Sequence, residues 1–153
     1  MFQVPYFMLY IAADHGGYPL KEELKEFLAK EGYEVVDLGA EELDLIDDFP
    51  DYAQKLAEQV AQDEDSGGIL ICGTGQGVCM VANKVTGIRA AMVYNDFTAK
   101  DAADHLNANI ICLGGRVTDA ETAKKAVKIW LETEFLEEER HVRRLRKVEE
   151  MEE

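Results

Sequence analysis

The sequence contains few cysteines and few basic residues, and each shortage excludes a class of protein. Three cysteines in 153 residues (Cys72, Cys79 and Cys112), an odd number with no Cys-x-x-Cys pair, fit neither a disulfide framework nor a zinc site. The 16 Lys and Arg residues stand against 31 Asp and Glu, and the net charge of −15 repels nucleic acid and anionic membrane surfaces. We therefore expect a cytoplasmic protein that binds neither.

Long apolar runs, internal repeats and linkers are absent as well. No stretch approaches the 18 apolar residues that a membrane-spanning helix needs. The apolar residues 1–8 have no Lys or Arg before them, unlike a signal peptide. Residues 1–153 are therefore expected to form a single domain.

Short apolar runs alternate with longer amphipathic segments, a pattern typical of βαβ units. We predict strands at 7–13, 34–38, 68–72, 88–94 and 109–113. Apolar residues at helical spacing lie between them, at Leu20, Leu24, Phe27 and Leu28, at Tyr52, Leu56 and Val60, and at Ala123, Val127, Trp130 and Leu131. The expected fold is α/β: a single doubly wound five-stranded parallel sheet flanked by helices, Rossmann-like with three α/β/α layers, and followed by a basic C-terminal helix over 136–150.

Chemically capable residues follow three of the predicted strands. Residues 14–17 read Asp-His-Gly-Gly, residues 72–77 read Cys-Gly-Thr-Gly-Gln-Gly, and residues 114–116 read Gly-Gly-Arg. Ligands of doubly wound sheets bind beyond the carboxyl ends of the strands. The sequence therefore predicts a site at that edge.

The turn formed by Gly73, Thr74, Gly75, Gln76 and Gly77 precedes a predicted helix. Alternating glycines let backbone N–H groups converge on an anion. The turn is neither a P-loop, which ends in Gly-Lys-Ser/Thr, nor a G-x-G-x-x-G dinucleotide motif. The alternative is that these glycines only permit a tight strand-to-helix turn.

Cys72 ends the strand before this turn, where N–H groups favour a thiolate. The alternative for any cysteine is a small buried apolar residue, the interpretation that we prefer for Cys112 and Cys79. For Cys72, its position favours chemistry.

Histidine and arginine supply the other candidates. His15 and His105 can move protons near neutral pH or, as cations, hold an anion, although most histidines do neither. Asp14 could equally be a helix N-cap. Arg140 and Arg144 share a helical face and suit a phosphate, but on these residues alone an ordinary solvated helix with ion pairs to 137–139 is the preferred interpretation.

Taken together, these motifs resemble the type B ribose-5-phosphate isomerase family, which includes galactose-6-phosphate isomerase subunits. The resemblance covers about residues 8–147. The elements that carry it are Asp14-His15-Gly16, Cys72-Gly73-Thr74-Gly75-x-Gly77, Asn83-Lys84-x-x-Gly87-Ile88-Arg89-Ala90, His105, Gly114-x-Arg116 and Arg140-His141-x-x-Arg144. Residues 1–7 then form an N-terminal extension, since family members begin close to the first strand.

The resemblance implies an aldose–ketose isomerase that interconverts ribose 5-phosphate and ribulose 5-phosphate through an enediolate, with no metal and no organic cofactor. It implies the following roles: Cys72 as the base, Thr74 and the N–H groups of Gly73, Gly75, Gln76 and Gly77 as the oxyanion site, His105 as the ring-opening group, Asp14 as a ligand of sugar hydroxyls, and His15, Arg116, Arg140 and Arg144 as substrate and phosphate ligands. Some relatives have a glutamate base where this chain has Val78, so the cysteine type fits. The family forms homodimers or tetramers with sites across the dimer interface, so His105 is expected to serve a neighbouring chain.

One position departs from the family pattern. An asparagine that contacts the substrate usually follows the ring-opening histidine, and here that position is Leu106. The sequence therefore leaves open an isomerase of a six-carbon sugar phosphate, of the allose 6-phosphate or galactose 6-phosphate type. A non-catalytic sugar-phosphate sensor is a further alternative. A phospho-receiver is disfavoured, because Cys72 stands where its aspartate belongs.

Overall fold

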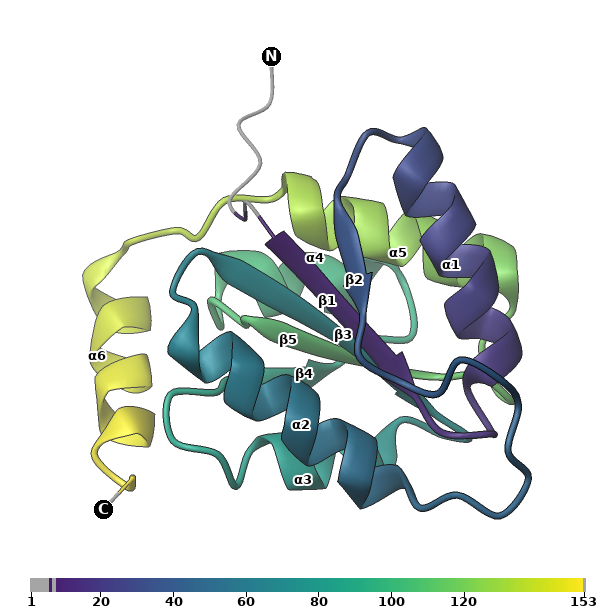
Figure 1. Ribbon diagram of the computed structural model, residues 1–153. Helices are drawn as coiled ribbons and strands as arrows, with labels where there is room; N and C mark the ends of the chain where they lie inside the picture. Colours follow the sequence, from purple (N-terminus) through teal and green to yellow (C-terminus); the bar gives the residue numbers. More distant parts are fainter. Residues whose placement is uncertain (1–5, 7, 153) are drawn as a thin grey trace.

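The computed structural model describes residue 6 and residues 8–152. Strands and helices alternate as expected (Figure 1). The strands are β1 (Met8–Ala13), β2 (Val35–Asp37), β3 (Ser66–Cys72), β4 (Ala90–Met92) and β5 (Ile110–Gly114). The helices are α1 (Tyr18–Lys30), α2 (Phe49–Gln62), α3 (Gln76–Ala82), α4 (Asp96–Asp104), α5 (Ala120–Glu132) and α6 (Glu139–Glu149).

The five strands form one parallel sheet in the order β2-β1-β3-β5-β4. This order makes β1, β3 and β5 neighbours. Ala13 pairs with Ile71, and Cys72 pairs with Gly114, so these strands end at the same level of the sheet. The three loops that follow them must therefore lie side by side.

Helices cover both faces of the sheet (Figure 1). Buried residues of α1, α4 and α5 pack with Ile69 and Ile71 on one face, and those of α2 and α3 pack with Leu70 and Cys112 on the other. The strands are apolar on both sides, as expected for a parallel sheet between two helical layers. The predicted fold class is confirmed.

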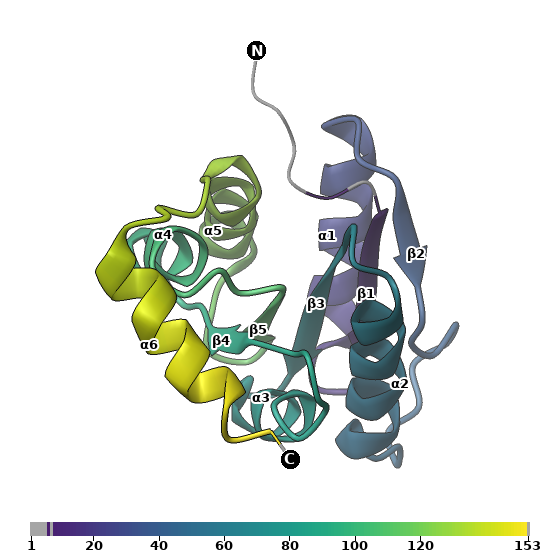
Figure 2. The same ribbon diagram turned by 90° about the vertical axis from the view of Figure 1, so that its left-hand side faces the viewer.

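Helix α6 lies beside α4 and β4, at one end of the sheet (Figure 2). The predicted boundary was wrong, because residues 136–138 are not helical. The N–H of Leu136 donates to the carbonyl of Asp104 at 2.9 Å, which ties this segment to the end of α4. The helix begins only at Glu139.

The expected extension, residues 1–7, lies outside the described residues except for Tyr6. The hydroxyl of Tyr6 donates to the carbonyl of Ala108 at 2.9 Å, and its ring lies 5.3 Å from that of Trp130. Burial raises the pKa of Tyr6 to about 12. Within the described part of the chain, no helix has both the length and the apolar composition needed to cross a bilayer.

Candidate active site

Three loops meet at the carboxyl edge of the sheet, after β1, β3 and β5. Their backbones approach so closely that a side chain would not fit at some positions. A Cβ at Gly16 would lie 2.8 Å from the backbone nitrogen of Gly73, and one at Gly115 would lie 2.6 Å from the carbonyl oxygen of Gly16. The N–H of Arg116 donates to the carbonyl of Gly73 at 2.9 Å. The structure thus brings together the three segments that the sequence singles out.

Cys72, the last residue of β3, is 5% exposed at this edge. The N–H of Gly75 donates to its Sγ at 3.2 Å. Gly75 has a φ of +85°, a conformation that a residue with a side chain rarely adopts, and this turn brings its N–H back to the sulfur. An N–H directed at a sulfur stabilises negative charge there. The geometry therefore suits a thiolate.

The rest of the turn leads into α3. Thr74 and Gln76 are exposed, and the N–H of Gln76 lies 3.4 Å from Oγ1 of Thr74. A Cβ at Gly77 would lie 2.7 Å from the ring of Phe49, so this position makes room for an aromatic side chain. Gly73, Thr74 and Gln76 are thus the solvent-accessible part of the turn next to Cys72, whereas Gly75 is buried.

The guanidinium of Arg116 lies against this turn. A Cβ added to Gly73 would be 3.1 Å from Nη1 of Arg116. Within residues 6 and 8–152, no carboxylate lies at ion-pair distance from Arg116. Its N–H groups are therefore available for an anionic ligand beside Cys72.

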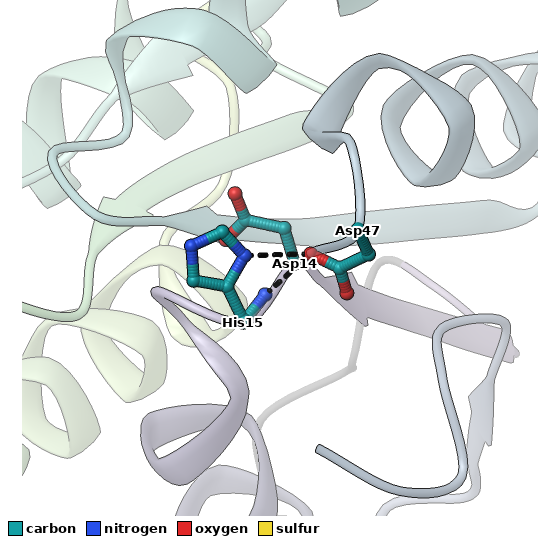
Figure 3. Close-up of side chains that lie close together, drawn as sticks. All are labelled: Asp14, His15 and Asp47. Carbon is teal, nitrogen blue, oxygen red and sulfur yellow. Dashed lines mark hydrogen bonds and ion pairs between the residues drawn. The ribbon is translucent and has the colours of Figure 1, made fainter. Parts of the chain in front are cut away.

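Asp14 and His15 lie on the loop after β1, and Asp47, from the segment before α2, lies close to them (Figure 3). Oδ1 of Asp14 accepts from the N–H groups of Gly16 and Gly17, at 2.9 and 3.3 Å. The N-cap of α1 is Gly17 and has no side-chain bond, so Asp14 closes the preceding turn and is not the N-cap. Ligating atoms of Asp14, His15 and Asp47 lie within 4.8 Å of one another.

Asp47 is a residue of this group that sequence reasoning missed. Its Oδ1 lies 2.7 Å from Nδ1 of His15 and accepts from the N–H of the same residue at 3.0 Å. The two residues are 32 positions apart, and no local motif around Asp47 links them. Only the tertiary structure reveals the contact.

His105 caps the C-terminus of α4. Its Nδ1 lies 2.9 Å from Oδ1 of Asp101, and its Nε2 lies 3.8 Å from Oδ1 of Asp104. The ring is packed against that of His141, with centroids 4.4 Å apart. This arrangement holds one face of the His105 ring and leaves the side chain about half exposed.

His141 is buried at 2% exposure, and its Nδ1 lies 2.9 Å from the carbonyl oxygen of Leu136. Its Nε2 is buried without a hydrogen-bond partner, the one such side-chain atom among the described residues. A carbonyl oxygen only accepts, so Nδ1 carries the hydrogen. Apart from the motif that contains His141, nothing in the sequence indicates this hydrogen bond to Leu136.

His105 and Arg144 line the same surface pocket of about 270 Å³. The residues around it are Asp101, His105, Leu106, His141, Arg144, Leu145 and Val148. Arg140 does not line it, because its Nε pairs with Glu138 at 3.0 Å. The ion pair expected of an ordinary solvated helix thus exists for Arg140, whereas Arg144 has no carboxylate partner within the described ranges.

The predicted residues fall into two groups at opposite ends of the strands, one around Cys72 and the other around His105 and Arg144. Helix α4 follows β4 and returns antiparallel to the strands, so His105 lies near the amino end of β5. Cys72 lies beside Gly114, at the carboxyl end of β5. The four residue steps of β5 from Ile110 to Gly114 span about 13 Å. A single chain does not bring His105 to Cys72.

The other two cysteines lie inside the fold. Cys112 is fully buried on β5, and contact with the Cys79 thiol and burial raise its pKa well above the ordinary range. The same contact lowers the pKa of Cys79, which is half-buried on α3. The interpretation of Cys112 as a small buried apolar residue is confirmed by its burial.

The fold and these loops define an α/β protein of the doubly wound class with a candidate ligand site at the carboxyl edge of the sheet. The family model described as Ribose/Galactose Isomerase matches residues 9–148. The chain belongs to this family, as its motifs predict.

Several individual proteins are similar along nearly the whole chain. The probable ribose-5-phosphate isomerase B of Mycoplasma genitalium is 47% identical over 144 residues, 93% of each chain. The D-erythrulose-4-phosphate isomerase of Pectobacterium atrosepticum is 39% identical over 125 residues, 82% of each chain. The structure of ribose-5-phosphate isomerase B from Mycoplasma genitalium with bound ribulose-5-phosphate has a TM-score of 0.91 and 43% identity, and the match covers 95% of both chains.

Proposed function

We propose that the protein is an aldose–ketose isomerase that interconverts ribose 5-phosphate and ribulose 5-phosphate. The observation that carries the proposal is the Cys72 thiol, which receives the N–H of Gly75 at 3.2 Å and has the Arg116 guanidinium nearby. Its position at the carboxyl edge, in a chain of the ribose/galactose isomerase family, supports this assignment.

The chemistry follows from these groups. The Cys72 thiolate removes the proton from C2 of the open-chain aldose, and the electrons of that bond form the C1–C2 double bond of an enediolate. The C1 oxygen takes up the negative charge, which the N–H groups of 73–77 stabilise, with Thr74 beside them. The thiol then returns its proton to C1, and the proton of the O2 hydroxyl passes to the C1 oxygen, so that O2 becomes the ketone oxygen and O1 becomes a hydroxyl. These proton transfers complete the reaction, so the proposal includes no metal and no organic cofactor.

We propose that each site is shared between two copies of the chain. His105 and Arg144 share a pocket but lie at the edge of the sheet opposite to Cys72. A second copy supplies His105 for ring opening and Arg144 for the phosphate. Arg140 is kept as a further phosphate ligand, which must first leave its exposed ion pair with Glu138. Exposed apolar residues near edge strand β4 and on α6 support such an association: Met80, Tyr94, Phe97, Leu106, Val148 and Met151.

The substrate phosphate is proposed to bind basic side chains from both copies. Arg116 and His15 come from the loops beside Cys72, and Asp14 holds sugar hydroxyls through the carboxylate oxygen that the turn leaves free. Arg144 of the second copy completes the set. The cytoplasmic setting indicated by the cysteine content stays a prediction.

Two variants with separate defects test the function and the sharing together. Cys72→Ala and His105→Ala are each expected to abolish interconversion of ribose 5-phosphate and ribulose 5-phosphate. When equal amounts are unfolded and refolded together, half of the random dimers are mixed, and each mixed dimer has one intact site. Activity is therefore expected to return to about one quarter of the parent value.

Three outcomes contradict parts of this proposal. Full activity of Cys72→Ala excludes Cys72 as the base. No recovery in the mixture shows that each site is built from one chain. Binding of ribose 5-phosphate by calorimetry, with no turnover by the parent protein, favours the sensor.

The six-carbon alternative is kept because Leu106 lines the pocket of His105 and Arg144. An apolar side chain there offers no hydrogen bond to a sugar hydroxyl. One relative, from Pectobacterium atrosepticum, is described as a D-erythrulose-4-phosphate isomerase, a name that specifies a four-carbon sugar phosphate. Comparing kcat/KM across four-, five- and six-carbon aldose phosphates decides between these substrates.

A further inference from the structure

Asp47 holds His15 at two points with one carboxylate oxygen. Oδ1 of Asp47 accepts the backbone N–H of His15 at 3.0 Å and lies 2.7 Å from Nδ1 of its ring. The Asp47 side chain is 6% exposed, while that of His15 is 27% exposed. Figure 3 shows the ring with Nδ1 facing Asp47 and the other nitrogen pointing away. The contact is therefore largely sheltered on the Asp47 side and open on the His15 side.

The segment that carries Asp47 is fixed at both ends. At its start, the fully buried ammonium of Lys21 donates to the carbonyl of Ala40 at 2.8 Å. At its end, Phe49 begins α2 and its ring packs against Gly77, next to the Cys72 turn. Asp47 thus reaches His15 from a segment anchored to α1 and to the candidate site.

The other charged and titratable groups nearby do not compete for Nδ1 of His15. Oδ1 of Asp14 is occupied by two backbone N–H groups. The pKa of Tyr52 is raised, first by burial and then by the negative charge of Asp47, so this phenol is neutral and adds no charge beside Asp47. Among the described residues, both hydrogen bonds of the Asp47 carboxylate are with His15, which borders the site.

We propose that Asp47 is a positioning residue that fixes the ring orientation and the tautomer of His15 for a phosphate monoester. A carboxylate only accepts, so the contact requires a hydrogen on Nδ1 and leaves Nε2 facing the ligand. In the neutral ring Nε2 accepts the P–O–H hydrogen of a monoanionic phosphate monoester, and in the imidazolium its N–H donates to a phosphate oxygen. The ring is then held in place before the substrate arrives, and binding costs less conformational entropy. The ligand half of this inference rests on the proposed function, whereas the tautomer half does not.

The tautomer is measured directly by ¹⁵N NMR of the histidine ring nitrogens. The signals of His15 are assigned by their loss in His15→Ala. The spectra are recorded at alkaline pH, where imidazole rings are neutral. The parent protein is then expected to carry the His15 hydrogen on Nδ1, and Asp47→Ala is expected to shift it toward the Nε2–H form that predominates in free histidine. Asp47→Asn, whose Oδ1 still accepts, is expected to restore the parent tautomer. The same tautomer in the parent and in Asp47→Ala overturns the proposal.

Kinetics tests whether Asp47 acts through His15. Asp47→Ala is expected to raise KM for ribose 5-phosphate about tenfold, the usual effect of weakening one charge-assisted contact, while kcat changes little. In a His15→Ala background, the same substitution is expected to change KM no further. An equal effect in both backgrounds shows a structural role and overturns the proposal.

A matched control and a separate readout complete the design. Glu42→Ala removes an exposed carboxylate from the same segment and is expected to leave KM and the His15 signals unchanged. If Cys72→Ala retains activity, the proposed function fails, but the NMR comparison still decides the tautomer. If the NMR comparison fails while Cys72→Ala is inactive, only the role of Asp47 is lost.

Discussion

Gly75 offers the sharpest test of how the Cys72 turn is built. Its φ of +85° costs a residue with a Cβ about 1–2 kcal/mol. A Cβ there would also lie 2.9 Å from the carbonyl carbon of Leu113, in the backbone of β5. Ordinary contact begins near 3.4 Å, so Gly75→Ala must move the turn by roughly 0.5 Å or strain it, which adds about 1–3 kcal/mol.

Gly32 provides the matched control. It has nearly the same φ, +91°, but no atom lies within 4 Å of its Cβ position, and it lies in the turn between α1 and β2. Gly32→Ala is therefore destabilised only by the positive φ and by no steric contact. The midpoint temperature of thermal unfolding is expected to fall by about 2–4 °C for each kcal/mol of stability lost in a chain of this length. Gly75→Ala should therefore unfold several degrees below Gly32→Ala.

The two variants should differ more strongly in activity. In Gly75→Ala the N–H that donates to Sγ of Cys72 moves, and small misplacements at a reacting centre lower kcat by about tenfold to a hundredfold. Gly32→Ala should retain the parent kcat. Equal melting temperatures for the two variants, together with an unchanged kcat for Gly75→Ala, would refute the reasoning about this turn.

Two further predictions concern Asp37 and Leu106. Burial raises the pKa of Asp37, but hydrogen bonds from Lys21, Lys25 and the N–H of Gly39 outweigh burial and lower the pKa overall. The ionised Asp37 therefore stabilises the folded state above the unfolded pKa of about 4, and this stabilisation is lost as the pH falls through the lower folded pKa. In urea unfolding, Asp37→Asn should therefore be less stable than the parent by a constant amount from pH 5 to 7, and the gap should shrink below pH 4; a gap that widens there would contradict this. Leu106→Asn should raise kcat/KM for ribose 5-phosphate about three- to tenfold by offering a hydrogen bond to a hydroxyl, while the control Val148→Asn on the same pocket should not; a fall in Leu106→Asn would favour a substrate that needs the apolar side chain.

The fold was predictable because a sequence in which short apolar runs alternate with amphipathic segments is compatible with few folds. The ends of the strands and helices were harder to predict, because side chains there replace backbone groups as hydrogen-bond partners. Strand β4 was predicted over 88–94 and spans only Ala90–Met92. The N–H of Arg89 donates to the side chain of Asn109, and the N–H of Tyr94 donates to Oγ1 of Thr98. Neither contact follows from hydrophobic periodicity.

The candidate site divides in the same way. The loops after β1, β3 and β5 could be placed at one edge because parallel strands end together. The contact of Asp47 with His15 could not, since it joins segments 32 residues apart through a tertiary contact alone. The distance of His105 from Cys72 follows from topology, once α4 is known to run antiparallel to the strands. A pattern of strands and helices thus predicts where a site lies better than which side chains complete it.

The net charge of −15 does not exclude a phosphate ligand, because ion pairing decides which cations are available locally. In the basic helix α6, Arg140 pairs with Glu138 and Arg143 pairs with Glu139. Arg144 and Arg116 have no such partner in the described part of the chain. An acidic surface repels polyanions at long range, whereas in the proposed shared site two unpaired guanidiniums would bind one small phosphate. The excess of Asp and Glu residues therefore disfavours large anionic ligands but allows a small one.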